Sequence, residues 1–441
     1  MTSSLVKYKL SELATFKYGK TIRKSEIQEV GNFPVYSGYQ IVGYLPNYKY
    51  EEPQLIIVCR GVGGTGDIKI SPPNCSITNL AIVISCDENI VDMGYLYWKL
   101  LLSDTYSLRT GSAQPQITIN TLENFTIEIE PDIDKQREIA DILFCFNDKI
   151  ELNRQINQTL EQIAQAIFKS WFVDFDPVKA KIQANQNGQD LERAAMRAIS
   201  GKTDEELDQL SPEHRQQLAE TAALFPDELE DSEIGEIPKE WNYGTLDELC
   251  WLNKNSWTKK NAPDEVRYVD LANTNNGVIE DIQYYDWEKA PSRARRILKP
   301  RDTIVGTVRP GNRSFALIGE RDKQLTGSTG FAVLTPKKSE YQEYIYIAST
   351  RDANIERLAH LADGAAYPAV RPDIVTNMEI AIADEEVFKK FSEIARPIFS
   401  QREYHFSQNN ILEGCRNTLL PKLLSGEICL DDTQSTVVAM A

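Results

Sequence analysis

The chain of 441 residues is poor in the side chains that build metal sites and disulfide frameworks. Its three histidines lie far apart, and its seven cysteines are an odd number in which no two form a CxxC pair. Structural zinc sites need such ligands at short spacing, and small secreted domains pair their cysteines. We therefore expect no bound metal, no structural disulfide and a reducing compartment.

Long apolar runs are missing as well. No stretch approaches the ~18 apolar residues of a membrane span. The first residues, MTSSLVKYKL, lack the apolar segment of a signal peptide. We expect a cytoplasmic protein that makes no use of a membrane.

The usual catalytic motifs are absent, since HExxH, GxSxG, a Walker loop and an NPPY-like methyltransferase tetrapeptide do not occur. Residues 61–66 do read GxGxxG after the apolar run LIIVC. A dinucleotide fold needs a helix to open at that point, so that its amides can hold a pyrophosphate. The chain continues instead with DIKISPP, a β-type pattern followed by prolines. We interpret the glycines as backbone that another group must approach closely, and we expect no catalytic residue and no cofactor.

Positive charge is scarce, and the net charge is -17. This acidity is concentrated in residues 173–240, which hold 17 acidic and 7 basic side chains, whereas residues 241–384 hold 20 and 19. Because nucleic-acid binding relies on lysine and arginine, the location of the charge matters. One basic stretch stands out and is either a DNA contact or a solvated face: Lys289, Arg293, Arg295, Arg296, Lys299 and Arg301.

What the chain does contain is a near repeat of itself. Residues 111–132 align with residues 364–385 at one constant shift of 253, with identities such as Gly111 with Gly364 and Pro115 with Pro368. Upstream the match is looser and aligns Arg60 with Arg309, and Thr78 with Thr329. Solenoid repeats have periods of roughly 20 to 50 residues. The longer period predicts two domains of one kind, each a small β-rich sheet with a few helices.

A long amphipathic helix is predicted after each copy, because apolar residues recur there in heptads. At 1.5 Å per residue the first helix is about 58 Å long, which suits a spacer. Alternatively, each helix packs only on its own module. Polar residues interrupt both seams at equivalent places, and we predict that Asn153 and His405 fix the register of the helices. In the first helix, position a is held by Ile139, Phe146, Asn153, Leu160 and Ile167, and position d by Ile142, Ile156 and Ile163.

Between the copies lies an acidic connector with helix signals. Residues 191–200 have helix-forming composition and end before Gly201, while Thr203 with Glu206 forms a capping box and Ser211 precedes another helix. The acidic, turn-rich end at residues 225–241 is predicted to be an exposed linker. The expected domains are 1–132 and 241–385 for the modules, 133–172 and 386–425 for the helices, 173–240 for the connector and 426–441 for a tail.

The order of these parts resembles the DNA specificity subunit of Type I restriction-modification systems. LSELATFKYGK and LDELCWLNK open the copies, GSAQPQIT and GAAYPAVR come near their ends, and WFVDFDPVKAK and FPDELEDSEIGEIPKEW look like that family's central region. The resemblance covers nearly the whole chain. It implies an α+β fold with two target recognition domains separated by two long helices, which pair as an antiparallel coiled coil with a pseudo-two-fold axis.

The same resemblance implies a function. The chain would read a bipartite site on double-stranded DNA and would itself be no enzyme. Two modification subunits would methylate adenine with S-adenosylmethionine, and two restriction subunits would cut DNA with ATP and Mg²⁺. Two alternatives remain: a helical scaffold without a DNA role, and a self-contained enzyme. The basic loop in the second module argues against the scaffold, and the missing nucleotide and NPPY-like motifs argue against the enzyme.

Candidate DNA-contacting residues follow from side-chain chemistry. Arginine and lysine pair with guanine edges, asparagine and glutamine pair with adenine, and hydroxyl groups mostly contact phosphates. In the first module the candidates are Ser37, Tyr39, Arg60, Lys69, Asn79, Gln114 and Gln116, and in the second they are Arg309, Asn312, Arg313, Thr329, Tyr367 and Arg371.

Overall fold

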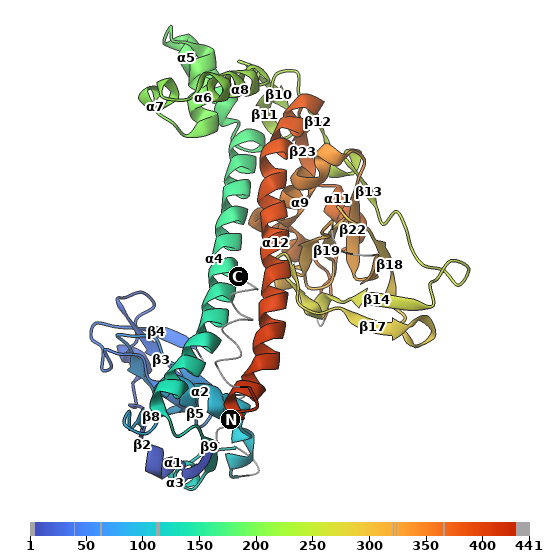
Figure 1. Ribbon diagram of the computed structural model, residues 1–441. Coiled ribbons are helices and arrows are strands. Elements are labelled where there is room, and N and C mark those ends of the chain that lie inside the picture. Colours follow the sequence, from blue (N-terminus) through green and yellow to red (C-terminus); the bar gives the residue numbers. More distant parts are fainter. Residues whose placement is uncertain are drawn as a thin grey trace. The chain divides into compact units, whose positions relative to one another are not determined.

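The structure is a computed structural model, and it describes residues 5–428 except 39, 62–63, 112–114, 321, 323 and 365–366 (Figure 1). The chain divides into two compact units. Unit 1 lies within Met1–Asn153 and Ser407–Ala441, and unit 2 is Arg154–Phe406. Each long helix therefore belongs partly to one unit and partly to the other.

Unit 1 contains the first module, built on a four-stranded sheet of order β2-β8-β5-β6. A three-stranded sheet, β4-β3-β7, and the pair β1-β9 complete it. The apolar core lies between the first sheet, helix α2 and parts of both long helices. The elements are β1 (Val6–Lys9), α1 (Leu10–Leu13), β2 (Ala14–Tyr18), β3 (Phe33–Tyr36), β4 (Ile41–Leu45), β5 (Leu55–Val58), β6 (Ile68–Ile70), β7 (Ser76–Ile77), β8 (Ala81–Cys86), α2 (Met93–Leu102), the 3-10 helix η2 (Thr105–Leu108), α3 (Ile119–Glu123) and β9 (Thr126–Ile129).

Unit 2 contains the second module, with four-stranded sheets of order β13-β22-β19-β20 and β17-β14-β21-β18 and the pairs β12-β23 and β15-β16. Its core includes aromatic side chains from both long helices, among them Phe172 and Phe391. The module's elements are β12 (Asn242–Thr245), β13 (Cys250–Leu252), β14 (Glu265–Val269), β15 (Thr274–Asn275), β16 (Val278–Ile279), β17 (Gln283–Asp286), β18 (Ala294–Leu298), β19 (Thr303–Gly306), the 3-10 helix η6 (Pro310–Asn312), β20 (Phe315–Leu317), β21 (Leu325–Ser328), β22 (Phe331–Pro336), α9 (Gln342–Thr350), α10 (Asp352–Leu361), α11 (Pro372–Thr376) and β23 (Glu379–Ile382).

The two modules share one topology, which confirms the duplication. The order β2-β8-β5-β6 repeats as β13-β22-β19-β20, and the pair β1-β9 repeats as β12-β23. In the other sheet, β3 pairs parallel with β7 as β14 does with β21, and antiparallel with β4 as β14 does with β17. Strand β18, which carries much of the basic stretch, is an addition on the far side of β21 with no equivalent among the described strands of the first module.

The connector forms the helices that its capping residues predict. Helix α6 (Leu191–Ser200) ends at Gly201 in the left-handed conformation, and α7 (Asp204–Asp208) has the capping box of Thr203. Helices α5 (Asp176–Gln186) and α8 (Pro212–Ala223) complete this part.

The exposed linker predicted for residues 225–241 is wrong in part. A hairpin of β10 (Leu229–Ser232) and β11 (Gly235–Pro238) forms there. Its Ile237 is buried in the core of unit 2, and so is Trp241 just after it. Acidic composition hid the hairpin, because its charged side chains point to solvent while a few apolar residues hold it in place.

The long helices are α4 (Ile133–Phe172) and α12 (Glu385–Leu424). The predicted position a stripe of α4 is buried or half-buried, and at position d Ile142 and Ile156 are half-buried whereas Ile163 is 45% exposed. A more deeply buried second stripe lies one residue further along, at position e, where Asn157 contacts the other helix. The buried side chains of this stripe are Leu143, Ile150, Asn157, Ala164 and Trp171.

The helices run antiparallel, as contacts within each unit show. In unit 1, Arg416 Nη1 donates to Asn147 Oδ1 at 2.6 Å, and Asn153 Nδ2 donates to Gln408 Oε1 at 2.7 Å and Asn409 Oδ1 at 2.8 Å. The partners on α12 thus come earlier in the sequence as α4 advances.

Unit 2 contains the second polar layer. His405 Nδ1 lies 2.8 Å from Asn157 Oδ1, and its Nε2 lies 2.9 Å from Gln401 Nε2. A neutral imidazole that donates from Nδ1 and accepts at Nε2 satisfies both contacts. Asn153 and His405 thus each meet amide side chains in their own unit, and their role in register remains a prediction.

The glycine-rich loop after β5 leads into strand β6 and not into a helix. Gly66 has a φ of +102°, and a Cβ there would lie 2.9 Å from the ring of Tyr106. Around it, Thr105 Oγ1 donates to the Gly66 carbonyl oxygen at 2.7 Å, and Tyr106 Oη donates to Asp67 Oδ1 at 2.6 Å. The close approach comes from η2 of the same module, which explains the glycine without a nucleotide.

We predict that Asn153→Leu lowers the free energy of unfolding by about 1–3 kcal/mol, because the Asn409 side-chain oxygen loses its donor in a buried seam. The double variant Asn153→Leu/Asn409→Leu should lose less than the sum of the single variants, since both amide groups are then replaced. Thermal unfolding of all three variants measures the coupling. Gln158→Leu, at an exposed position of α4, is the control and should change stability by less than about 0.5 kcal/mol. Strictly additive losses would contradict the layer described above.

We also predict that Gly66→Ala destabilises unit 1 by about 1–3 kcal/mol beyond the cost of a positive φ, because the new methyl group meets the Tyr106 ring. Gly235 is a matched control, with a φ of +100° and nothing within 4 Å of the place that a Cβ would take. Calorimetry should show a clearly larger loss for Gly66→Ala than for Gly235→Ala. Equal losses would mean that backbone strain alone accounts for the glycine.

Candidate nucleic-acid interface

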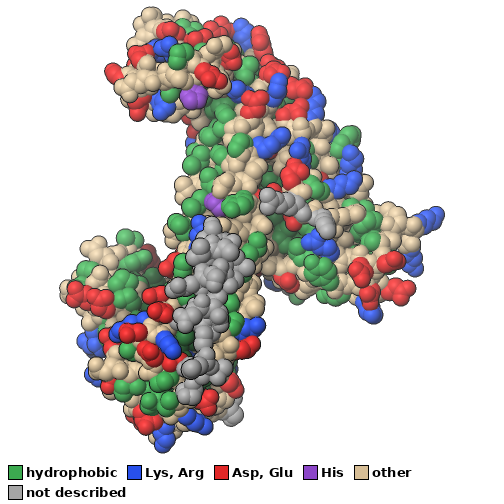
Figure 2. Space-filling view, in the orientation of Figure 1, with side chains coloured by type: hydrophobic (Ala, Val, Ile, Leu, Met, Phe, Trp, Pro, Cys, Tyr) green, Lys and Arg blue, Asp and Glu red, His purple; other side chains and the backbone are tan. Residues whose placement is uncertain are grey.

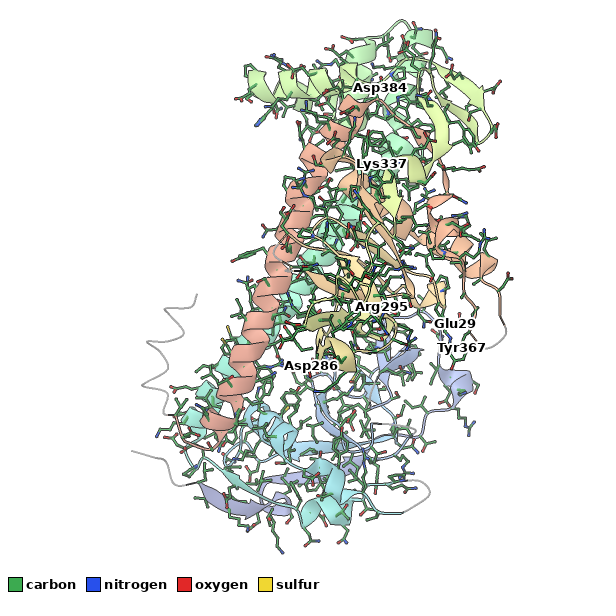
Figure 3. The ribbon with its side chains drawn as sticks, turned by 90° about the vertical axis from the view of Figure 1, so that its right-hand side faces the viewer. Glu29, Asp286, Arg295, Lys337, Tyr367 and Asp384 are labelled. Atoms are coloured by element: carbon green, nitrogen blue, oxygen red, sulfur yellow. The ribbon has the colours of Figure 1, made fainter. Side chains whose placement is uncertain are left out.

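The second module places two of its candidate residues against each other. Arg309 follows β19 in the left-handed conformation, with a φ of 48°, and its backbone N–H donates to the Pro368 carbonyl oxygen at 2.7 Å. Its guanidinium carbon lies 4.7 Å from the ring centroid of Tyr367, which is 71% exposed. Figure 3 labels Tyr367 on its loop. Arginine stacked on an exposed ring offers charge and a flat surface together.

Thr329 lies at the same end of the module. The Thr307 N–H donates to the Gly330 carbonyl oxygen at 2.8 Å, and the Val370 N–H donates to the Thr307 carbonyl oxygen at 2.9 Å. These bonds join the loops after β19 and β21 and the loop before α11. Thr329 is exposed, and its N–H donates to the carbonyl oxygen of Arg293 at 2.8 Å. The structure therefore brings Arg309, Thr329 and Tyr367 into one cluster of loops, which we call the second loop cluster.

Asn312, Arg371 and Arg313 border this cluster and differ in how they are paired. Asn312 is exposed, and Arg371 is an exposed partner of Asp373. Arg313 is half-buried, donates from Nε to Asn276 Oδ1 at 2.7 Å and forms an ion pair with Asp352. Its charge is thus largely committed within the protein, so Arg313 is the weakest of the six candidates for a DNA contact.

The first module repeats the arrangement. The Cys59 N–H donates to the Leu80 carbonyl oxygen at 2.8 Å, and the Ile117 N–H donates to the Cys59 carbonyl oxygen at 2.9 Å. These bonds join the loop after β5, the loop between β7 and β8 and the loop before α3. They form the first loop cluster, which contains Arg60, Asn79 and Gln116.

The side chains of the first loop cluster have different surroundings. The guanidinium carbon of Arg60 lies 5.5 Å from the ring centroid of Tyr18, and Asn79 Nδ2 donates to Thr21 Oγ1 at 3.2 Å. Gln116 is exposed while its backbone pairs with Thr110. Tyr18 and Thr21 were not among the candidates, because only the folded chain brings them to these loops.

The remaining candidates of the first module are less well placed or not described. Ser37 is buried, and its Oγ donates to the Gln40 carbonyl oxygen at 3.0 Å, so it stabilises a turn. Lys69 is half-buried on β6. Tyr39 and Gln114 lie outside the described residues.

The structure corrects the alignment of the two modules by one residue. The bonds from Cys59 to Leu80 and from Thr307 to Gly330 are equivalent, as are those from Ile117 to Cys59 and from Val370 to Thr307. Arg60 therefore corresponds to Val308 and not to Arg309. The sequence comparison matched the two arginines because they are the same residue type. Residue identity in a loop is weaker evidence of equivalence than the backbone hydrogen bonds that extend from paired strands. On the corrected alignment, Asn79 corresponds to Thr329.

The basic stretch around β18 is only partly available for binding. Lys289 pairs with Asp286 and Arg301 with Glu320, both at 2.5 Å. Burial lowers the pKa of Arg296. The guanidinium carbon of Arg295, which Figure 3 labels, lies 4.4 Å from the Trp287 ring. Arg293, next to Thr329, and Lys299 are exposed, as is Lys289 in its ion pair with Asp286.

Arg293 was not singled out as a DNA contact, although the basic stretch contained the signal. Its link to Thr329 adds it to the second loop cluster.

The first loop cluster contains the thiol of Cys59. Burial raises the pKa of the Cys59 thiol, although Arg60 beside it acts in the opposite direction. A thiol held protonated is a poor nucleophile. Among the described residues, no group of three or more histidine, cysteine or acidic side chains could hold a metal ion. No described helix is long and apolar enough to cross a membrane. On the face that Figure 2 shows, basic and acidic side chains are interspersed over each unit.

Comparison with known proteins identifies the family. A family model described as the Type I restriction modification DNA specificity domain matches residues 3–162. The Type I restriction enzyme MjaIX specificity subunit of Methanocaldococcus jannaschii is 23% identical over 350 residues, covering 77% of this chain and 69% of that protein. The crystal structure of the Type-I restriction-modification system S subunit from M. genitalium has the same fold, with a TM-score of 0.60, 14% identity and 96% coverage of both chains.

A third relative is closer in sequence. The Type I restriction enzyme HindI specificity subunit of Haemophilus influenzae is 32% identical over 380 residues, covering 80% of this chain and 82% of that protein. Such identity, maintained over four-fifths of the chain, means that the chain belongs to the specificity subunits of Type I restriction enzymes.

Proposed function

We propose that each module reads one half of a bipartite target on double-stranded DNA, and that the paired helices set the distance between the halves. The observation that carries this proposal is the duplicated loop cluster. Equivalent hydrogen bonds gather the same three loops in both modules, and each cluster presents polar or charged side chains at the end of the central strands. Two equivalent readers in one chain suit two half-sites.

The side chains suggest how each cluster would work. Arginine can pair with guanine in the major groove, asparagine and glutamine can pair with adenine, and threonine and tyrosine can anchor phosphates. Arg309 and Tyr367 in the second cluster would provide both kinds of contact, whereas Arg60, Asn79 and Gln116 in the first would contact bases. Since the modules have little net charge, each would bind alone only weakly, and the two together would bind more strongly.

We further propose that the chain is not catalytic and carries no cofactor of its own. Two modification subunits would bind it and methylate adenine with S-adenosylmethionine, and two restriction subunits would use ATP and Mg²⁺ to cut DNA. In this complex the specificity chain would determine which DNA sequence is bound. Partner subunits would also provide cations for phosphate contact, which offsets the net charge of -17.

Methylome sequencing tests the two-reader model directly. The chain is expressed with its modification subunit in a host without DNA methylation, and the modification subunit alone serves as the control. We expect a new split motif with methylated adenine in both halves. An assembled complex that adds no methylation would contradict the proposal and favour a scaffold without a DNA role.

We predict that Arg309→Ala weakens recognition of one half-site and that Arg60→Ala weakens recognition of the other. Loss of one arginine contact to a base costs about 1–3 kcal/mol, or roughly 5- to 150-fold in affinity. Binding of the assembled complex to duplexes with one half-site scrambled separates the two effects. Arg215→Ala, at an exposed position of the connector, is the control and should change neither. Equal loss at both half-sites from Arg309→Ala would refute the assignment of one reader to each module.

A further inference from the structure

Helices α2 and α9 are equivalent elements that attach each module to the long helix following it. Their sequences align at a shift of 249, which pairs residues 94–97, GYLY, with residues 343–346, EYIY. Tyr95 and Tyr344 are both buried. In unit 1, Tyr97 stacks on Phe144 of α4 with the ring centroids 5.9 Å apart. In unit 2, Tyr344 meets Phe388 of α12 at 4.9 Å.

The first module's attachment is apolar at its closest point. A Cβ on Gly94 would lie 2.7 Å from the ring of Phe144 and 3.2 Å from the Cβ of Ala140. Only a residue without a side chain leaves room for the phenylalanine ring there. Asp92 Oδ1 also lies 3.2 Å from this point, but Asp92 is the N-cap of α2 and accepts from the Tyr95 N–H. The side chains that α4 contributes here, Ala140 and Phe144, carry no charge, and the contact between the helices depends on steric fit.

The second module's attachment is ionic at the same point. Glu343, which corresponds to Gly94, is fully buried, and its carboxylate accepts from Ser392 Oγ at 2.8 Å and from Arg396 Nε at 3.0 Å. The helices align at a shift of 252, so that Ser392 corresponds to Ala140 and Arg396 to Phe144. Arg396 also donates from Nη2 to the Ser339 carbonyl oxygen at 2.8 Å. Three positions that are apolar in the first copy have become a hydrogen-bonded ion pair in the second.

A second ionic contact lies further along α12. Arg402 Nη2 is 2.6 Å from Glu161 Oε2 of α4, with the two side chains 6% and 18% exposed. Tyr346 of α9 donates from Oη to Glu161 Oε1 at 3.3 Å. A Cβ on Gly277 would lie 2.6 Å from Tyr346 Oη, so the turn between β15 and β16 also fits closely here. Arg402 corresponds to Ile150, which is again apolar in the first copy.

Pairing either module with the long helix of the other copy would be energetically unfavourable. A module carrying the buried carboxylate of Glu343 could not face a phenylalanine, because the charge would lose both donors. A module carrying glycine would leave the Arg396 and Ser392 side chains without their acceptor. Interfaces that combine a good fit to one partner with an unpaired charge against another are specific for that reason.

We propose that the two modules are keyed to their long helices by different chemistry: an apolar key of Gly94, Ala140 and Phe144, and an ionic key of Glu343, Ser392 and Arg396 supported by Glu161 and Arg402. Each key fixes its module on the correct helix. The key residues are positioning residues, and they touch no DNA. We expect these contacts also to set the distance between the two half-sites, and this consequence rests on the proposed function of the modules.

Transplanting the apolar key into the second module tests the proposal in the full chain. Arg396→Phe strands the buried Glu343 carboxylate with one hydroxyl donor, and the midpoint of thermal unfolding should fall by roughly 5–10 °C. Adding Glu343→Gly and Ser392→Ala completes the apolar key, and the triple variant should regain at least half of that loss. Lys389→Phe, an exposed position on the same helix, is the control for the added ring. A triple variant no more stable than Arg396→Phe alone would overturn the proposal.

Glu343→Gln is a milder variant, which keeps the test possible if Arg396→Phe does not fold. Glu343→Gln has nearly the same size, can still accept from Ser392 and removes the charge that Arg396 faces. It should lower the midpoint less than Arg396→Phe does, and a midpoint equal to that of the unaltered chain would count against the ionic key.

A DNA readout separates positioning from general stability. The assembled complex is tested on duplexes whose two half-sites are moved apart or together by one base pair. Glu343→Gln should reduce the preference for the native spacing several-fold while leaving the order of preferred half-site sequences unchanged, and the triple variant should restore it. Unchanged spacing preference would overturn the positioning role. If the unaltered complex prefers no bipartite duplex, the proposed function fails, whereas the unfolding series still decides whether the keys exist.

Discussion

The burial of two faces on each long helix is the constraint on which the rest of this structure depends. A helix of 40 residues such as α4 has modest stability alone in water, because its stability in proteins comes mainly from packing an amphipathic face. In α4 one stripe is provided by position a and another by position e, where Leu143 and Trp171 are buried. The other helix contacts both stripes, at Asn153 and at Asn157, and a module covers neighbouring positions such as Phe144. The modules are therefore part of what makes the helices persist.

This constraint explains which features could be predicted from the sequence. Local signals were reliable. Gly201 ends its helix through its left-handed backbone, and the hydroxyls of Thr203 and Ser211 begin helices by accepting from backbone N–H groups three residues further on. The long period of the repeat likewise identified the duplicated fold. The choice of position d for the second stripe failed at Ile163, since heptads describe two helices and take no account of a third surface.

The sequence indicated which loops contain the candidate residues, but not which of their side chains contact each other. Arg309 and Tyr367 were chosen separately. The folding of three loops onto one another brings the Arg309 guanidinium to 4.7 Å from the centroid of the Tyr367 ring. The pairing of Arg313 with Asp352, and the turn that buries Ser37, depend on residues distant in sequence or on backbone geometry. The equivalence of α2 and α9 is visible in the sequence as tyrosines at alternating positions. The difference between Gly94 and Glu343 can be explained only from the structure, which shows that Phe144 faces the first and Arg396 the second.

The buried polar residues of the helix pair follow from the same reasoning about fit. Leucine in place of Asn153, Asn157 and His405 would bury more apolar surface, but an all-apolar seam permits neighbouring registers of nearly equal energy. A slip of one heptad moves one helix past the other by about 10 Å, at 1.5 Å per residue. On DNA, with a rise of about 3.4 Å per base pair, that equals about three base pairs. Under the proposed function, a chain that reads two half-sites at a fixed distance cannot tolerate such a slip, whereas it can tolerate the few kcal/mol that polar layers cost. On that proposal, specific pairing along the helices, and of each module with its helix, matters more than maximal stability.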